Sequence, residues 1–359
     1  MNLKPQGAVG TPVKLLVIIV NYRVTDLTVR CLRALAGEIG AVPGARTVVC
    51  ENGTGPEAVR RLREAIETKG WDKWAYLRDV YPNRGFTGGN NVVIREALGW
   101  PEPPDYFFLL NADAFVRPGA VNELVRFMDE HPQVGVAGPR IENPDGSWQC
   151  SPFRDLTFIS ELDRGLRLGL ITRLLSRWNV TPPIPDSPTP AEWVSGSSMF
   201  IRRQVIEQIG PLDEGLYTYF DDPDFCLNAR RAGWEVWYVP ASRVSHLGGQ
   251  STGVGQKAER YGRLPSYWFL ARRRYFLKNY GAVRTALADA AFLAGFAAWR
   301  LRRRIQGKPD TDPPHMLWDS FRHSVFCTGF KVKPVPNPAL RDTATANGPL
   351  PAQESVLPS

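Results

Sequence analysis

The sequence predicts an α/β protein built on a doubly wound, mostly parallel sheet flanked by helices. Two observations indicate this class. Between residues 14 and 140, short apolar runs alternate three or four times with segments whose apolar residues recur at helical spacing. Polar or glycine-containing stretches follow several of these runs, at the carboxyl ends of the expected strands, where open α/β sheets bind ligands. We find no internal repeat.

The expected strands alternate with helices in the first part of the chain. Thr25 is expected to cap the first helix, and Thr54 and Glu57 have the spacing of a capping box before the second. A third helix is expected through about Ala97, and Pro118 is expected to start a fourth. The strands expected over this part are 14–20, 47–50, 74–77, 106–110 and 134–137.

The pattern changes after residue 140. Residues 151–192 combine a basic amphipathic patch with a proline-rich stretch, which predicts an inserted loop. Regularity returns with a strand from Trp193, a helix from about Arg203 and a strand over 235–239. The stretch 246–249 (HLGG) is expected to close the globular part.

Composition limits the class of protein. The chain has 359 residues, 43% hydrophobic and 22% charged, which suits one large domain with extras or two domains. The four histidines are scattered and predict no zinc cluster. The odd number of cysteines, without close pairing, predicts reduced thiols of a cytoplasmic protein. These are Cys31, Cys50, Cys150, Cys226 and Cys327.

The apolar runs predict neither a signal peptide nor a spanning helix. Residues 15–20 are too short for the apolar core of a signal peptide. No segment reaches the roughly 18 uncharged apolar residues that a transmembrane helix needs.

The run Tyr106–Leu110 predicts a strand buried on both faces, ending at Asn111-Ala112-Asp113. If the chain is still extended there, alternation places Asn111 and Asp113 on the same side. Their oxygens are ligands of the kind that Mg²⁺ or Mn²⁺ carrying a diphosphate prefers. The alternative is a strand that ends in an ordinary polar turn.

Two other strand ends carry polar residues that suit a nucleoside. Asn21 and Tyr22 end the first strand, and Glu51 and Asn52 end the second. A carboxylate at Glu51 can accept hydrogen bonds from a uracil or thymine imide or from ribose hydroxyls. The alternative is simple capping of the helices that follow.

The glycine-rich stretch 85–91 allows close approach to a ligand and exposes N–H groups at a helix start. It matches neither a Walker loop nor the GxGxxG pattern, and a glycine-rich turn is the alternative.

Asp221, Asp222 and Asp224 cluster before a helix, where acids also serve as caps. A carboxylate there can act as a general base toward an acceptor hydroxyl. Three aromatic residues precede this cluster, Tyr217, Tyr219 and Phe220, and are candidates for a sugar-stacking wall. His246 is a candidate third metal ligand beside Asp113, although a lone histidine is more often structural.

The basic charge is concentrated near the C-terminus. Residues 256–308 carry 13 Lys/Arg and two acidic residues, a net of +11, so the rest of the chain has −3 of the total +8. Arginines there are mixed with Trp, Tyr and Phe over 265–305, which suits an anionic membrane interface. The alternative is a solvated basic helical hairpin packed on the domain. Nucleic acid is a third possibility, which no recognised nucleic-acid module supports.

Taken in order, the motifs resemble the inverting glycosyltransferases of family 2 with the GT-A fold, nearest the rhamnosyltransferase-like branch of bacterial surface polysaccharide synthesis. The resemblance covers roughly residues 14–280. The matching motifs are VIIVNY (17–22), ENGT (51–54), NRGFTGGNN (83–91), LLNADAF (109–115), VSGSSMFIRR (194–203), GPLDEGLYTYFDDPDFCLNARRAGW (210–234) and HLGGQS (246–251).

The resemblance implies a role for each matching residue. Asp113 and His246 would hold Mg²⁺ or Mn²⁺, and Asp222 would be the catalytic base. Asp221 remains open as the base, because the family often has Glu-Asp where this chain has Asp221-Asp222. The family usually has Asp at the place of Glu51, so the contact of this residue with the nucleotide base is in doubt. The nucleotide-sugar would be bound by Asn21, Tyr22, Glu51, Asn52, Gly85, Phe86, Gly89, Asn90 and Asn111.

The resemblance also implies the reaction and its setting. A sugar, rhamnose or another hexose, would pass with inversion from a nucleoside-diphosphate sugar to a hydroxyl of a glycan or lipid-linked acceptor. The protein would be cytoplasmic and peripheral on the inner membrane face, and would bind no nucleic acid. A catalytically silent glycan- or nucleotide-sugar-binding protein and a sugar nucleotidyltransferase are the alternatives.

The resemblance and the patterns together divide the chain. Residues 1–13 would form a leader, and 14–260 would form a GT-A domain with a nucleotide-sugar half (14–140) and an acceptor half (141–260). Residues 261–307 would form an amphipathic, membrane-associating helical segment. A mostly disordered tail is expected over 308–359.

Overall fold

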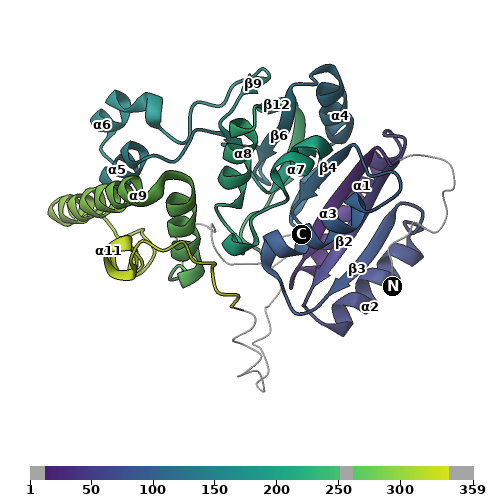
Figure 1. Ribbon diagram of the computed structural model, residues 1–359, viewed down its shortest axis with the longest axis horizontal. Helices are drawn as coiled ribbons and strands as arrows, with labels where there is room; N and C mark the ends of the chain where they lie inside the picture. The colour runs from purple at the N-terminus through teal and green to yellow at the C-terminus, as the bar shows by residue number, and fades with distance from the viewer. Residues whose placement is uncertain (1–12, 251–261, 339–359) are drawn as a thin grey trace.

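The computed structural model describes residues 13–250 and 262–338 and confirms the predicted α/β class. A large sheet lies at one end of the molecule and a layer of helices at the other (Figure 1). The expected leader (1–13) lies almost wholly outside the described residues, as does the boundary expected at 260.

The sheet is mixed: one half is parallel, and the other half combines antiparallel pairs with the parallel pair of β6 and β12. Strands β1, β2, β3 and β4 pair in parallel, while β11 runs antiparallel between β4 and β6. The main path has the order β3-β2-β1-β4-β11-β6-β12-β5. Its strands are β1 (Leu15–Asn21), β2 (Ala45–Asn52), β3 (Ala75–Val80), β4 (Tyr106–Leu110), β5 (Ala114–Val116), β6 (Val134–Glu142), β11 (Ser198–Arg202) and β12 (Glu235–His246).

The short strands lie beside this path or outside it. Strand β7 (Trp148–Gln149) pairs with β6, and β9 (Thr189–Pro190) pairs with β12. Strands β8 (Pro152–Phe153) and β10 (Trp193–Val194) form a separate two-stranded sheet. Residues of both predicted halves of the domain therefore contribute to one continuous sheet.

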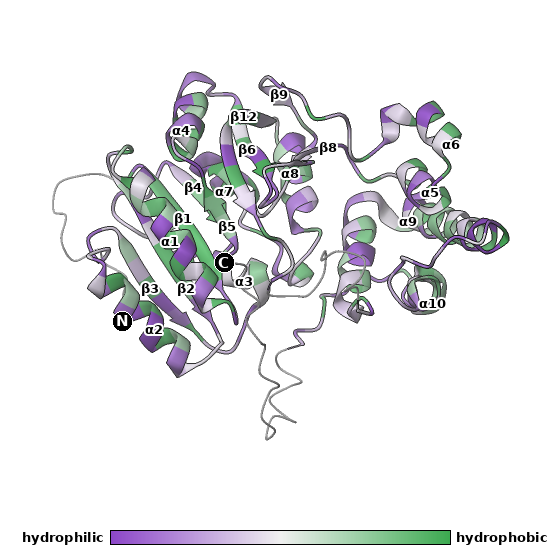
Figure 2. Ribbon diagram, turned by 180° about the vertical axis from the view of Figure 1, so that it is seen from behind, coloured by the Kyte–Doolittle hydropathy of each residue, from purple (hydrophilic) through white to green (hydrophobic). Residues whose placement is uncertain are grey.

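Helices cover both faces of the sheet. Successive side chains of a strand point to opposite faces, and the central strands are buried along nearly their whole length, so both faces must be covered. In β1, Leu15 and Val17 belong to the core under α1, α2 and α4, whereas Leu16 and Ile18 belong to the core under α3, α7 and α8. These apolar strands are green in Figure 2. The helices are α1 (Thr25–Ile39), α2 (Pro56–Thr68), α3 (Gly85–Leu98), α4 (Ala120–Glu130), α7 (Arg203–Ile209) and α8 (Asp221–Arg231).

Two predicted caps are wrong. Thr25 is the first residue of α1 and not its cap, and α2 begins after Gly55 without a side-chain cap. The Thr54 hydroxyl instead accepts the backbone N–H of Arg23 at 2.9 Å, which ties the end of β1 to the end of β2. A tertiary bond between neighbouring strand ends has thus replaced the local cap.

The helical layer is built by segments far apart in the chain. The expected loop 151–192 contains α5 (Phe158–Leu166), α6 (Gly169–Leu174) and the short η1 (Ser176–Trp178). The basic segment forms the long α9 (Ser266–Ile305), bent at Gly281, where φ is +76°. Where a mostly disordered tail was expected, the described residues 308–338 hold α10 (Met316–Arg322) and α11 (Val325–Thr328).

Helix α5 packs closely on the second half of α9. A Cβ on Gly165 would lie 2.8 Å from the Phe292 carbonyl oxygen, and one on Gly295 would lie 2.9 Å from the Leu162 carbonyl oxygen. Both glycines are therefore needed for this helix crossing.

A buried ion cluster joins four parts of the helical layer. Arg272 in the first half of α9 donates to Glu161 of α5 at 2.6 Å and to Asp289 in the second half of α9 at 2.5 Å. Glu161 also accepts from Arg164, and Asp289 accepts the backbone N–H of Val325. The cluster engages Arg272, a basic residue of the segment that was expected to face a membrane.

Among the described residues, helix α9 is long and apolar enough to cross a membrane, although charged residues interrupt it, so no run of 18 uncharged apolar residues occurs there. Its qualifying window of 18 residues has a mean hydropathy of 1.2, and 33% of that window is buried inside the protein. Core helices of soluble proteins pass the same test, so this feature alone is weak support for a membrane span.

Candidate functional site

The structure brings Asn111, Asp113 and His246 together although His246 is far away in sequence. The imidazole Nε2 of His246 lies 3.4 Å from the Asp113 carboxylate and 3.4 Å from Nδ2 of Asn111. Strand β12 places His246 here because it pairs antiparallel with β5, and His246 lies opposite Ala114 in that register. The structure therefore places these three side chains close to one another.

The reason given for that grouping is corrected in part. Residues 112–113 form a turn after β4 and are not extended, so strand alternation does not apply to them. The turn is held by the Asn111 carbonyl, which accepts the N–H of Ala114 at 3.0 Å, and by the Asp113 carbonyl, which accepts the N–H of Leu247 at 3.1 Å. Asn111 and Asp113 converge because both ends of the turn are fixed by neighbouring strands.

The donor set suits a hard divalent cation. Two ligands bound in cis positions about 2.1 Å from such a cation lie about 3 Å apart, close to the Asp113–His246 separation. Both side chains retain some exposure, 9% for Asp113 and 15% for His246. In the described part of the chain no group of three His, Cys, Asp or Glu residues gathers to hold a metal. The pair therefore fits a cation that takes its other ligands from water and phosphate.

The polar residues that end β1 and β2 are occupied with one another and with nearby backbone. Glu51 accepts the N–H groups of Gly53 and Thr54 at 3.2 and 2.7 Å. Asn21 accepts from the Thr28 hydroxyl at 2.7 Å. Glu51 and Asn21 are almost fully buried, so they shape the turns at the sheet edge. Tyr22 remains partly exposed, with the Arg23 guanidinium over its ring.

Asn52 links the second strand to the glycine-rich stretch. Its amide nitrogen donates to the side chain of Asn83 and to the carbonyl of Gly85, at 3.0 and 2.9 Å. Its oxygen accepts the N–H of Arg84 at 3.0 Å. Asn52 thereby fixes the start of α3.

The glycine-rich stretch forms the first turns of α3, not a loop before it. Gly85 has φ +73°, and a Cβ there would lie 2.4 Å from the carbonyl oxygen of Tyr217. A Cβ on Gly89 would lie 3.0 Å from Val20. These glycines allow α3 to pack closely on β1 and on the segment before α8. Phe86 stays partly exposed.

Asn90 carries a hydrogen-bonding group without a partner. Its Nδ2 donates to the Phe86 carbonyl at 2.9 Å. Among the described residues, nothing donates to its buried Oδ1. Such an orphan acceptor is uncommon in a folded protein and is often explained by a bound ligand or water.

Asp222 is the better placed of the two neighbouring acids to meet a substrate. Asp222 is the second residue of α8 and its side chain is partly exposed, whereas Asp221 is 5% exposed. Its Oδ2 accepts the N–H of Gly196 at 3.0 Å. Ser197 follows Gly196 in the chain, and its carbonyl accepts the N–H of Asn111 at 2.8 Å. The loop 195–197 therefore joins Asp222 to the Asn111 turn.

Burial changes the acidity of both acids. Burial raises the pKa of Asp222 to about 6, against the opposing effect of the Gly196 N–H. Burial and the adjacent charge of Asp222 raise the pKa of Asp221 well above its ordinary value. Asp222 therefore ionises before Asp221 and is the carboxylate available to accept a proton near neutral pH.

The backbone before α8 is strained. Tyr217, Tyr219 and Phe220 have φ values of +64°, +67° and +61°. Each such residue costs about 1–3 kcal/mol and persists only when its surroundings fix it. The predicted aromatic wall packs on α9, with Tyr219 stacked on Tyr267 at 6.1 Å between ring centroids.

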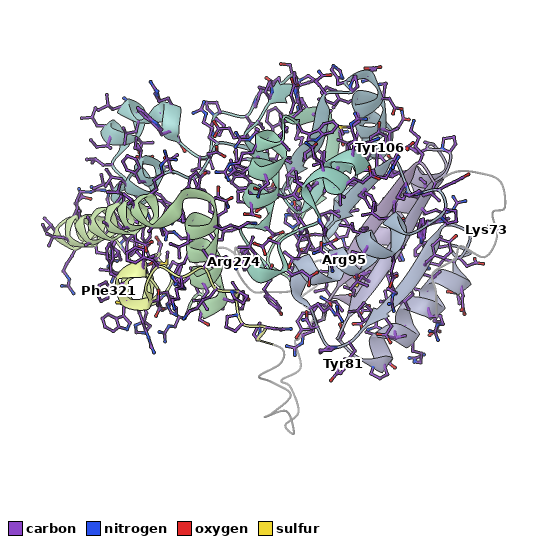
Figure 3. The ribbon with its side chains drawn as sticks, in the orientation of Figure 1. Lys73, Tyr81, Arg95, Tyr106, Arg274 and Phe321 are labelled. Atoms are coloured by element: carbon purple, nitrogen blue, oxygen red, sulfur yellow. The ribbon has the colours of Figure 1, made fainter. Side chains whose placement is uncertain are left out.

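Helix α9 clamps this strained segment from both sides. Lys278 binds Asp213 before the segment at 3.0 Å and Asp224 after it at 2.6 Å. Arg274 also donates to Asp213, at 2.9 Å, and lies where α9 meets the sheet domain (Figure 3). Arg274 and Lys278 hold the pKa of Asp213 below its ordinary value, although burial alone would raise it. The basic residues of this part of α9 therefore support the candidate site.

The sequence did not single out Gly196, Asp213 or Lys278. Gly196 lies within a motif that carried the family resemblance, but nothing in that motif indicates a bond to Asp222. Asp213 and Lys278 are 65 residues apart, and no spacing rule connects them. Only the fold reveals these contacts.

With this geometry described, comparison with known proteins gives the class. Residues 12–274 match the family described as "Glycosyltransferase like family 2", and the chain belongs to that family. Sugar transfer is the reaction class of its named relatives.

The curated relatives match over part of their length. An N-acetylglucosaminyl-diphospho-decaprenol L-rhamnosyltransferase of Mycobacterium tuberculosis is 30% identical over 163 residues, 43% of this chain and 51% of the relative. The low-salt glycan biosynthesis hexosyltransferase Agl10 of Haloferax volcanii is 28% identical over 60% of this chain and 61% of its own. Rhamnosyltransferase WbbL of Escherichia coli is 22% identical over 53% of this chain and 71% of its own length. The chain thus spans about half the length of the mycobacterial relative.

Solved structures confirm the GT-A glycosyltransferase fold. The mannosyltransferase PcManGT of Pyrobaculum calidifontis, solved with GDP-Man and Mn²⁺, has a TM-score of 0.51 at 13% identity, covering 95% of this chain and 89% of its own. GalNAc-T7, solved with UDP, GalNAc and Mn²⁺, has a TM-score of 0.54 at 14% identity. The match covers 88% of this chain and 55% of the GalNAc-T7 chain.

Proposed function

We propose that this glycosyltransferase moves a hexose from a nucleoside-diphosphate sugar to a hydroxyl of a glycan or lipid-linked acceptor, with inversion. Asp222 carries the proposal. It is a partly exposed carboxylate, held by the Gly196 N–H at 3.0 Å, and its pKa of about 6 leaves it ionised at neutral pH. That is what a general base for a hydroxyl nucleophile requires.

Asp113 and His246 would hold Mg²⁺ or Mn²⁺, as their 3.4 Å separation and donor atoms allow. When bound, the cation neutralises the charge that develops on the nucleoside diphosphate leaving group. Asn111, 3.4 Å from His246, would position that ligand and adds no charge to the site. The Mn²⁺ present with PcManGT and GalNAc-T7 supports this assignment.

The donor would lie along the carboxyl ends of β1, β2 and β4, where Tyr22, Phe86 and Asn90 offer a ring face and an unpaired acceptor. Asn21, Glu51, Asn52, Gly85 and Gly89 would act by fixing the turns around the donor. Their burial and internal hydrogen bonds support this positioning role more than direct contact.

The reaction would be a single displacement. Asp222 accepts the proton of the acceptor hydroxyl as its oxygen attacks the anomeric carbon, and the bond to the diphosphate breaks on the opposite face. Asp221, whose pKa is raised well above its ordinary value by burial and by the charge of Asp222, would take no part in this proton transfer. The name of the mycobacterial relative gives its acceptor as N-acetylglucosamine joined to a lipid through a diphosphate. This name supports a lipid-linked acceptor and a place on the inner membrane face.

Release of nucleoside diphosphate from a panel of sugar nucleotides, with Mn²⁺ or Mg²⁺ and a lipid-linked saccharide acceptor, tests the proposed function. We expect release from one class of hexose donor that depends on added acceptor. No release from any donor across a broad acceptor panel would refute the reaction.

The pH dependence of turnover follows from the acidity of Asp222. The base must be ionised, so kcat should rise as pH increases through about 6 and then level off. Asp221→Asn should leave this rise in place, because an amide resembles the protonated acid. A rate independent of pH between 5 and 8 would contradict the assignment of Asp222, given a pKa of about 6.

Removal of the proposed metal ligands gives a separate prediction. Asp113→Asn and His246→Ala should each weaken Mn²⁺ binding, measured by titration with nucleoside diphosphate present, by about 10–100-fold or more. Asp26→Asn, which changes an exposed carboxylate on α1, is the matched control. Mn²⁺ affinity equal to that of the wild type in both ligand variants would place the cation elsewhere.

A further inference from the structure

Exposed apolar side chains gather in the helical layer. Among the described residues, 15 large hydrophobic side chains are exposed, and nine of these lie in 283–332 and three in 168–174. Only Tyr81, Trp148 and Phe158 lie elsewhere. Soluble monomers rarely concentrate exposed apolar surface in this way without a binding partner.

The second half of α9 presents a continuous apolar stripe to solvent. Val283 and Leu301 are 18 residues apart, which is about five helical turns, so they lie on the same side of the helix. Leu287 lies four residues after Val283, and Ile305 lies four residues after Leu301, on that same side. Val283 is 75% exposed and Leu287 is 47% exposed. Leu301 is 63% exposed and Ile305 is 77% exposed.

Between these two pairs the same side of the helix carries only small apolar residues, the exposed Ala290, Ala294 and Ala297. The opposite side packs into the protein through Ala288, Phe292 and Phe296, which are buried. The helix is therefore apolar on two faces. Packing inside the chain accounts for one of them only.

The stripe continues into a groove between α9 and α10. The groove has a volume of about 500 Å³ and is lined by Leu293 and Ala297 of α9 and by Trp318 and Phe321 of α10, among others. Trp318 is 58% exposed and Phe321 is 42% exposed. Phe321 lies in the helical layer, well away from the sheet domain (Figure 3).

Basic residues border this apolar surface. Arg304, Lys308 and Arg322 are exposed, and within the described ranges no carboxylate pairs with them. Two copies joined through the stripe would bring these like charges together. An anionic lipid surface would instead attract each basic residue.

We propose that the stripe of α9 with α10 is the surface by which the protein docks on an anionic phospholipid bilayer, lying in the plane of the interface. The stripe defined by Val283, Leu287, Leu301 and Ile305 enters the headgroup region, and Trp318 lies at its level, as interfacial tryptophans do. The inference deepens the proposed function, because a lipid-linked acceptor is presented at such a surface. The first half of α9 has no part in docking, since its charges clamp the catalytic segment.

Vesicle co-sedimentation of the full chain tests this surface without donor, acceptor or metal. The vesicles contain phosphatidylcholine alone or phosphatidylcholine with phosphatidylglycerol. We expect binding to the anionic vesicles, and about tenfold or more weaker binding for the pairs Leu301→Glu/Ile305→Glu and Val283→Glu/Leu287→Glu. Tyr81→Glu is the matched control, because Tyr81 is 72% exposed and lies in the sheet domain (Figure 3).

Charge and self-association give the remaining outcomes. Arg304→Gln/Lys308→Gln/Arg322→Gln should lose the preference for anionic vesicles. Binding by both glutamate pairs at the wild-type level would overturn the proposal, as would absence of wild-type binding. A wild-type dimer without lipid that either glutamate pair converts to a monomer would assign the stripe to a second copy instead. Acceptor-dependent release of nucleoside diphosphate by the glutamate pairs, using a short-chain soluble acceptor, should match wild type, so lipid docking can fail while the proposed reaction stands.

Discussion

Asp222→Asn is expected to lower kcat by about 10²–10⁴-fold, the usual contribution of a positioned general base. The substitution preserves shape, and the amide oxygen can still accept the Gly196 N–H that holds Asp222 at 3.0 Å. It removes the ability to take a proton from the acceptor hydroxyl. Steady-state kinetics with saturating donor and acceptor measure the loss, and donor affinity should change little.

Asp221→Asn is the matched control for this variant. The two residues are adjacent and acidic, but Asp221 is 5% exposed and holds its proton more firmly. Its replacement should therefore leave most of the activity. If Asp221→Asn caused the larger loss, with the fold intact by circular dichroism, the roles assigned to the two acids would be exchanged.

Arg272→Met is expected to destabilise the helical layer by about 3–5 kcal/mol, the cost of leaving buried charges without their partner. Arg272 is 8% exposed and donates to both Glu161 and Asp289. Without it, Asp289 keeps only the Val325 N–H among its described partners. Denaturant unfolding followed by hydrogen exchange of α5 and α9 measures the loss. Arg284→Met, an exposed arginine of the same helix, should cost far less.

A second variant separates lost packing from unpaired charge. Arg272→Met combined with Asp289→Asn removes the carboxylate that loses its charged partner, while Glu161 keeps its pair with Arg164, and it should recover part of the stability. No recovery would mean that the arginine acts mainly through its contacts with aromatic rings, such as that of Phe276.

The fold was predictable because its strands are apolar on both faces and its helices on one. The run at Tyr106–Leu110 was predicted with the bounds that β4 has, since a strand buried on both faces leaves an uninterrupted apolar signal. The strands β2, β6 and β12 are longer than predicted, because their ends are stabilised by neighbours and not by composition. The antiparallel position of β11 depends on chain topology, which no local pattern reveals.

The candidate site was predictable in its acids and not in its support. Asp113 and Asp222 follow recognisable patterns, and His246 was added by the family resemblance. The supporting contacts are bonds between distant parts of the chain, such as Asn52 to Gly85 and Lys278 to Asp213. Sequence patterns report on a residue's own element, so they gave no sign of the close packing of the α3 glycines or of the clamp formed by α9.

The anomeric configuration of the newly formed glycosidic bond tests the central claim most directly. It can be read by NMR from the coupling at the anomeric proton or carbon of the first product formed. Single displacement with Asp222 as base predicts that this configuration is opposite to that of the sugar nucleotide. A product that retains the donor configuration would contradict the account, because retention requires a different arrangement of reacting groups.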